Sequence, residues 1–86
     1  MNEYMMTYTK SGKNHSMGFK SETVKSARHI VFSKLLSADL DAVPLYRLKK
    51  TGGSTFIGYV GFSGGHGRFA GTAWYTVGNK KERHPL

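Results

Sequence analysis

One stretch of the sequence decides the fold: residues 21–38, SETVKSARHIVFSKLLSA, where the hydrophobic period changes to that of a helix. Apolar residues recur there at a spacing of 3.6 residues, which predicts one amphipathic helix. Ser21 is the predicted N-cap, and Glu22 suits the positive end of the helix dipole. The predicted apolar stripe consists of Val24, Ala27, Val31, Leu35 and Ala38, widened by Ile30 and Phe32.

The chain on either side of this helix alternates polar and apolar residues with a period of two, which is typical of strands. Turn residues separate the segments, and short connections make neighbouring strands antiparallel. The sequence therefore predicts an α+β fold of order ββαβββ, a curved antiparallel sheet with one helix packed on one face. The predicted strands are Glu3–Lys10, His15–Phe19, Val43–Lys49, Thr55–Phe62 and Arg68–Val77.

We expect a single α+β domain over residues 1–78, followed by a basic flexible tail over residues 79–86, which shows no apolar periodicity. Glycines inside strands mark a bend, a bulge or a close backbone approach. Gly58, Gly61 and Gly71 therefore predict strong curvature in the second half of the sheet.

Composition excludes several classes of function. The 86 residues include no cysteine, so disulfides and thiolate metal sites are excluded. The four histidines are not paired at ligand spacing and there are only five carboxylates, so we expect no metal, no cofactor and no catalysis. No apolar run spans a membrane and no secretory signal is evident, so we expect a cytoplasmic protein.

Charge is the strongest signal in the composition. The formal net charge is +8, and residues 44–86 carry seven Lys/Arg residues against Glu82 alone. A basic field attracts polyanions and favours contacts with phosphates. Nucleic acid or a ribonucleoprotein is therefore the expected partner, with an acidic protein surface as an alternative.

One helix covers only one face of a sheet, so the other face must meet water or a partner. We predict that Phe56, Val60, Phe62, Phe69, Ala73 and Tyr75 face the helix, leaving aromatic rings and cations together on the open face. Such a surface suits unpaired bases, which stack on aromatic rings. Ordinary cross-strand packing and a homodimer contact are alternatives, and the assignment of the two faces stays open because both carry aromatic residues. The predicted binding residues are Tyr46, Arg47, Lys49, Lys50, Tyr59, His66, Arg68, Trp74, Lys80 and Lys81.

The glycine loop over residues 61–67 joins two strands, whereas nucleotide-binding glycine loops lead into a helix, so no nucleotide site is predicted. Two other functions remain open. A small inhibitor of the kind found in phages and mobile elements, comparable to anti-CRISPR proteins in size, would bind a protein. A toxin-like ribonuclease would use His66 beside Arg68, with Lys49 or Lys50 nearby. The sequence leaves open whether the protein is a monomer or a homodimer.

Overall fold

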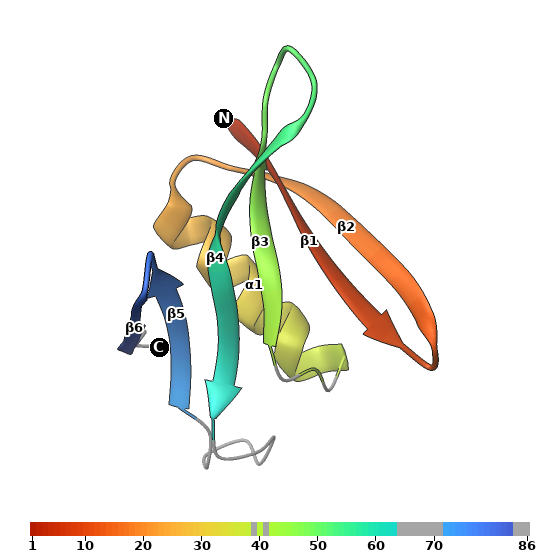
Figure 1. Ribbon diagram of the computed structural model, residues 1–86, viewed down its shortest axis with the longest axis vertical. Helices are drawn as coiled ribbons and strands as arrows, with labels where there is room; N and C mark the ends of the chain where they lie inside the picture. Colours follow the sequence, from red (N-terminus) through yellow and green to blue (C-terminus); the bar gives the residue numbers. More distant parts are fainter. Residues whose placement is uncertain (39, 41, 64–71, 84–86) are drawn as a thin grey trace.

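The computed structural model, shown in Figure 1, describes residues 1–38, 40, 42–63 and 72–83. These residues form one antiparallel sheet of six strands in the order β2-β1-β3-β4-β5-β6, together with one helix. The predicted α+β class is confirmed. The elements are β1 (Asn2–Lys10), β2 (Lys13–Ser21), α1 (Val24–Ala38), β3 (Ala42–Leu48), β4 (Ser54–Ser63), β5 (Thr72–Val77) and β6 (Lys80–Arg83).

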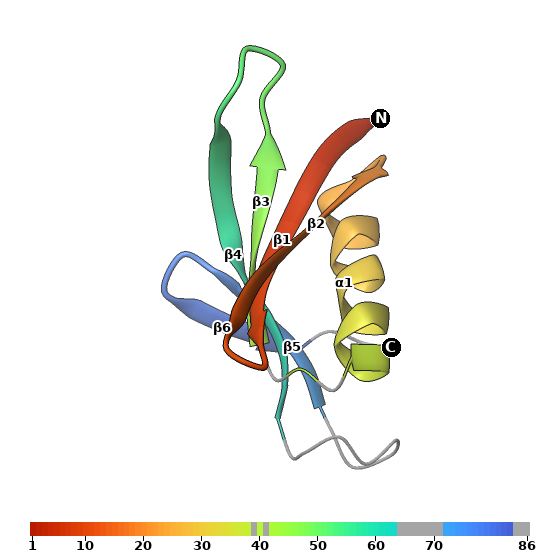
Figure 2. The ribbon, with the colours of Figure 1, turned by 90° about the vertical axis from the view of Figure 1, so that its right-hand side faces the viewer.

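The helix lies on one side of the sheet, as Figure 2 shows. Its predicted apolar stripe is buried at Ala27, Val31 and Leu35, and Phe32 is buried beside them. The sheet meets it with alternate residues of its central strands, as the period-two pattern requires. The buried core contributed by the strands consists of Tyr4, Met6, Val43, Leu45, Val60 and Ala73.

The helix begins later than predicted, and its N-cap is Thr23 rather than Ser21. The Ser26 backbone N–H donates to Thr23 Oγ1 at 3.1 Å, and the Thr23 N–H donates to Ser26 Oγ at 3.3 Å. This reciprocal pair is a capping box in which serine takes the usual place of glutamate. Glu22 therefore precedes the cap instead of lying in the first turn. Ser21, which is buried, bonds through its hydroxyl to that of Ser26.

Part of the segment 79–86, for which the sequence predicts a flexible tail, forms the last strand, β6. Lys80–Arg83 pairs with β5, with Val77 opposite Lys80 and Trp74 opposite Arg83. All four residues of β6 are exposed, so the strand has no apolar alternation that a sequence pattern could detect. Backbone pairing at the edge of the sheet holds it instead. Residues 84–86 lie outside the described part of the chain.

A β-bulge in β4 changes which side chains face the helix. Leu45 pairs with Gly58 but Tyr46 pairs with Phe56, so Ile57 is an extra residue on β4. An extra residue reverses the side-chain alternation beyond it. The prediction that Phe56 faces the helix is therefore wrong: Phe56 lies on the opposite side of the sheet, together with Tyr59.

Gly58 makes this bulge possible. Its φ is +157°, and a Cβ built there would lie 2.4 Å from the Thr76 carbonyl oxygen and 2.8 Å from Thr76 Oγ1. The Tyr59 backbone N–H donates to the same Thr76 hydroxyl at 2.9 Å. The backbone of β4 thus approaches β5 more closely than any side chain would allow, which agrees with the bulge or close approach that a glycine inside a strand marks.

Two further predictions concern the membrane and the loop before β5. Within the described residues, no helix has the length and apolar character needed to cross a membrane. The predicted positions of Arg68, Phe69 and Gly71 fall outside the described residues.

Candidate functional site

Three aromatic rings lie together on the side of the sheet that faces away from α1. Tyr46 and Phe56 are directly opposite each other on β3 and β4, with ring centroids 5.7 Å apart. Phe56 and Tyr59 form an edge-to-face pair at 5.3 Å and 69°. Phe56 is 51% exposed and Tyr59 50%, although side chains of this kind are usually covered in a small domain.

Trp74 extends this group onto β5. It is opposite Gly61, which has no side chain, and it is therefore diagonal to Tyr59 on the same side of the sheet. Lys81 on β6 lies with its Nζ 4.1 Å from the centroid of the indole ring, a cation–π contact. The Trp74 Nε1 is buried and has no hydrogen-bond acceptor among the described residues. We call Tyr46, Phe56, Tyr59 and Trp74 the aromatic surface.

The charges beside the aromatic surface are positive. Lys81 and Arg83 lie two residues apart on β6, on the same side of the sheet as Trp74. Arg83 is directly opposite Trp74, and Lys81 is diagonal to it. Glu82 is the one carboxylate in strands β3 to β6, and it is opposite Tyr75, whose side of the sheet faces the helix. The potential over this part of the open face therefore favours an anion.

Arg47, Lys49 and Lys50 lie elsewhere. Arg47 is opposite Tyr4 and Thr55 in the register, and this places it on the helix side of the sheet. Its Nη2 donates to Asn2 Oδ1 at 2.9 Å. Lys49 and Lys50 line the same groove as Arg47, between the β3–β4 hairpin and the start of α1. The prediction that Lys50 shares the open face with the aromatic rings is therefore wrong, because the turn after Leu48 takes it out of the strand alternation.

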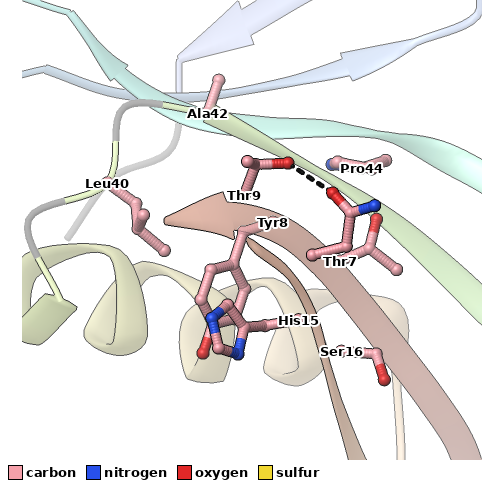
Figure 3. Close-up of a pocket in the computed structure, with 9 residues that line it drawn as sticks. Thr7, Tyr8, Thr9, His15, Ser16, Leu40, Ala42 and Pro44 are labelled. Atoms are coloured by element: carbon pink, nitrogen blue, oxygen red, sulfur yellow. Dashed lines mark hydrogen bonds between the residues drawn. The ribbon is translucent and has the colours of Figure 1, made fainter. Parts of the chain in front are cut away.

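A second hollow lies at the far end of the β1–β2 hairpin, shown in Figure 3. Its lining includes the hydroxyls of Thr7, Thr9 and Ser16, and Thr9 Oγ1 donates to Asn14 Oδ1 at 2.9 Å. His15 stacks on Tyr8 with ring centroids 5.1 Å apart. No Lys, Arg, Asp or Glu lines this hollow among the described residues.

Tyr75 confirms the predicted helix side of β5. The Arg28 guanidinium carbon lies 3.8 Å from the centroid of the Tyr75 ring, so the helix and β5 are joined by a cation–π contact. Burial lowers the pKa of the Arg28 guanidinium, while the interaction with Tyr75 opposes that shift. Arg28 and Tyr75 thus belong to the packing of the helix rather than to the aromatic surface.

The structure divides the predicted binding residues into separate groups. Tyr46, Tyr59, Trp74 and Lys81 are brought together on the open face, while Arg47, Lys49 and Lys50 form a groove on the helix side. Lys80 is opposite Val77, and its side chain therefore leaves β6 on the side away from Lys81. His66 and Arg68, and with them the ribonuclease constellation, fall outside the described residues.

Sequence reasoning missed two members of the open face, Phe56 and Arg83. For Phe56 the available signal was Gly58, which marked a bulge without giving its register. For Arg83 it was the spacing of two residues from Lys81. The described residues contain no group of three His, Cys, Asp or Glu side chains able to hold a metal ion.

Comparisons with protein-family models, with curated proteins and with solved structures find no match to this chain.

Proposed function

We propose that the protein binds unpaired nucleic acid on its aromatic surface, without catalysis, and that Lys81 and Arg83 contact the phosphates. The observation that carries the proposal is the half-exposure of Phe56 and Tyr59 on the side of the sheet that also carries Lys81 and Arg83 of β6. The absence of any carboxylate from the open side of the described residues of β3 to β6 supports an anionic ligand.

Stacking supplies the reason to favour an unpaired strand. A base that stacks on an aromatic side chain contributes about 1–3 kcal/mol, and each base can stack because every base has a flat face. A duplex hides those faces within its own stack. The rings of Tyr46, Phe56 and Tyr59 are tilted against one another, by 59° and 69° in the two pairs, so they do not form one continuous plane.

A salt titration tests the proposal. The affinity of the protein for fluorescein-labelled single-stranded DNA and RNA is measured by anisotropy between about 50 and 300 mM salt, with a duplex of the same sequence as comparison. We expect tighter binding to the single strand and a slope of log K against log salt of about −0.7 for each phosphate contacted. Undetectable binding at about 50 mM salt, or equal affinity for the duplex, would contradict the proposal.

Tyr59 gives a matched pair of variants. Tyr59→Ala removes the ring and is expected to weaken single-strand binding by roughly 5- to 100-fold, the loss expected for one stacked base. Tyr59→Phe keeps the ring and is expected to change the affinity less than about twofold. Equal losses in both variants would assign the effect to the hydroxyl and not to stacking.

A second copy of the chain is the alternative occupant of this surface, because exposed apolar patches also form dimer contacts. Sedimentation velocity at about 100 μM protein distinguishes a second copy from a nucleic-acid ligand. A dimer that buries the rings would dissociate when Phe56 is replaced by alanine. The proposal expects a monomer at that concentration. A dimer lost on substitution of Phe56 would contradict it.

A further inference from the structure

We propose that the groove between the β3–β4 hairpin and the start of α1 binds a phosphate group. We call it the basic groove, and define it by Arg47, Lys49, Lys50, Thr55, Val24 and Ile57. It lies on the helix side of the sheet, whereas the aromatic surface lies on the other. The inference is thus independent of the proposed function and stands if that function fails.

The groove exists because the sheet is longer than the helix at this end. Figure 2 shows the β3–β4 hairpin extending beyond the first turn of α1, which begins at Val24. The helix side of the hairpin is therefore left uncovered by α1 near its turn. Arg47 is exposed there, directly opposite Thr55, so a guanidinium and a hydroxyl stand side by side on neighbouring strands.

The bulge in β4 supplies the apolar part of the groove. The extra residue Ile57 is half-buried and packs against the core, and it lines the groove together with Val24 of the helix. The same irregularity that turns Phe56 toward the open face thus places an aliphatic side chain beneath the cations on the other side. The apolar side chains of Ile57 and Val24 thus line the groove together with its exposed cations.

Arg47 has hydrogen-bond donors to spare for a phosphate. A guanidinium has five donors, so Arg47 can keep its bond to Asn2 Oδ1 and still present a pair of N–H groups to a phosphate. Lys49 and Lys50 follow it in the turn and add two mobile charges. Glu3 also lines the groove, but its side chain leaves β1 on the open side of the sheet, where Oε1 lies 3.9 Å from Lys20 Nζ on β2.

The groove has the size of a small-molecule site. Its volume is about 810 Å³, within the range of about 300–1,000 Å³ that is usual for such sites. The phosphate can come from a free phosphorylated compound, or from the backbone of a strand whose bases occupy the aromatic surface. Inorganic pyrophosphate is the appropriate first probe, because it carries the charge without a base.

The test is a titration of ¹⁵N-labelled protein with pyrophosphate, followed in ¹H–¹⁵N correlation spectra. The backbone amides of Arg47, Thr55 and Ile57 are expected to shift, while those of the β1–β2 turn stay in place. Arg47→Gln is expected to raise the dissociation constant at least about tenfold, since it removes a charge-assisted pair of hydrogen bonds. Lys50→Gln changes an exposed residue in the turn between β3 and β4, and is expected to raise the dissociation constant by about threefold.

Lys13→Gln is the control, because Lys13 is equally exposed and lies at the turn of the β1–β2 hairpin, away from the groove. It is expected to change the dissociation constant less than about twofold. Equal losses in Lys13→Gln and Lys50→Gln, or shifts spread over all basic residues, would overturn the inference by showing a general effect of net charge.

A Phe56→Ala, Tyr59→Ala double variant separates this inference from the proposed function. It is expected to lose single-strand binding and to keep the pyrophosphate shifts in the groove. Loss of both single-strand binding and the pyrophosphate shifts would overturn the inference of an independent phosphate site. If Arg47→Gln also weakens single-strand binding, the phosphate held in the groove comes from the strand; if it weakens pyrophosphate alone, the groove takes a free phosphorylated compound. Both results support a phosphate site.

Discussion

The two halves of the open face share one sheet and differ in almost everything else. Over β3 to β6 it carries the aromatic surface with Lys81 and Arg83. Over β1 and β2 it carries mainly small or polar side chains, and its cation Lys20 lies 3.9 Å from Glu3 Oε1. The residues that occupy this second half are Glu3, Met5, Thr7, Thr9, Asn14, Ser16, Gly18 and Lys20.

The two halves occupy the same side of the sheet but present different side chains to it. In the described part of the chain, both halves lie on the side opposite α1, so both had to be compatible with water. The β1–β2 half meets that need with hydroxyls, an amide and a locally compensated charge. The β3–β6 half keeps rings half-exposed and its cations uncompensated by a carboxylate on the same side. We propose that a ligand accounts for the second arrangement.

The largest expected effect comes from replacing one glycine by alanine in each half, in two separate variants. Gly58→Ala would place a Cβ 2.4 Å from the Thr76 carbonyl oxygen, so we expect the free energy of unfolding to fall by about 3 kcal/mol. Gly18→Ala in β2 meets only Tyr4 O at 3.9 Å and is expected to raise it by up to about 0.5–1 kcal/mol. Urea unfolding followed by circular dichroism measures both. A Gly58→Ala protein as stable as the parent would contradict the claim that the bulge requires a glycine at position 58.

Phe56 gives the next effect. Phe56→Ala is expected to weaken single-strand binding by roughly tenfold, because it removes a ring on which a base stacks. Thr7→Ala, on the β1–β2 half, is expected to leave the affinity within about twofold. Anisotropy titrations at one salt concentration compare the two, with the far-ultraviolet spectrum as a check of folding. A larger loss from Thr7→Ala would reverse the proposed roles of the two halves.

The smallest expected effect comes from replacing one lysine in each half and measuring the salt dependence of binding. Lys81→Gln is expected to weaken single-strand binding by about threefold and to reduce the magnitude of the salt slope by about 0.7, the value for one phosphate contact. Lys20→Gln is expected to leave the slope unchanged, because Glu3 already compensates this charge. A reduction of the slope by the same amount in both variants would mean that the two halves attract the strand equally.

Most of the fold could be predicted from the sequence, because it depends on periodicity. The helix stripe through Ala27, Val31 and Leu35 and the alternation of Tyr4 and Met6 in β1 correspond to the buried core. Where backbone geometry rather than burial decides, the prediction failed. Ser21 and Thr23 are equally good N-caps by residue type, and the choice was made by Ser26, which bonds to Thr23.

The candidate site was predicted less completely than the fold, and for related reasons. A bulge shifts the register by one residue without any change in the apolar pattern, so Phe56 was assigned to the wrong side of the sheet. Strand β6 is charged throughout, and its pairing with β5 uses the backbone, so Lys81 and Arg83 could not be placed beside Trp74. Arg47 lies on the same side of β3 as Val43 and Leu45, as the alternation predicts. The pattern did not show that α1 begins too late to cover Arg47.

The most direct test of the central claim is to map a bound strand onto the two halves of the open face. A short single-stranded oligonucleotide is titrated into ¹⁵N-labelled protein at about 50 mM salt, and the backbone amide and indole N–H shifts are followed. The account predicts shifts at Tyr46, Phe56, Tyr59 and the Trp74 indole, with the amides of Thr7, Ser16 and Gly18 unmoved. Shifts concentrated on β1 and β2, or an indole resonance that does not respond at saturation, would contradict it.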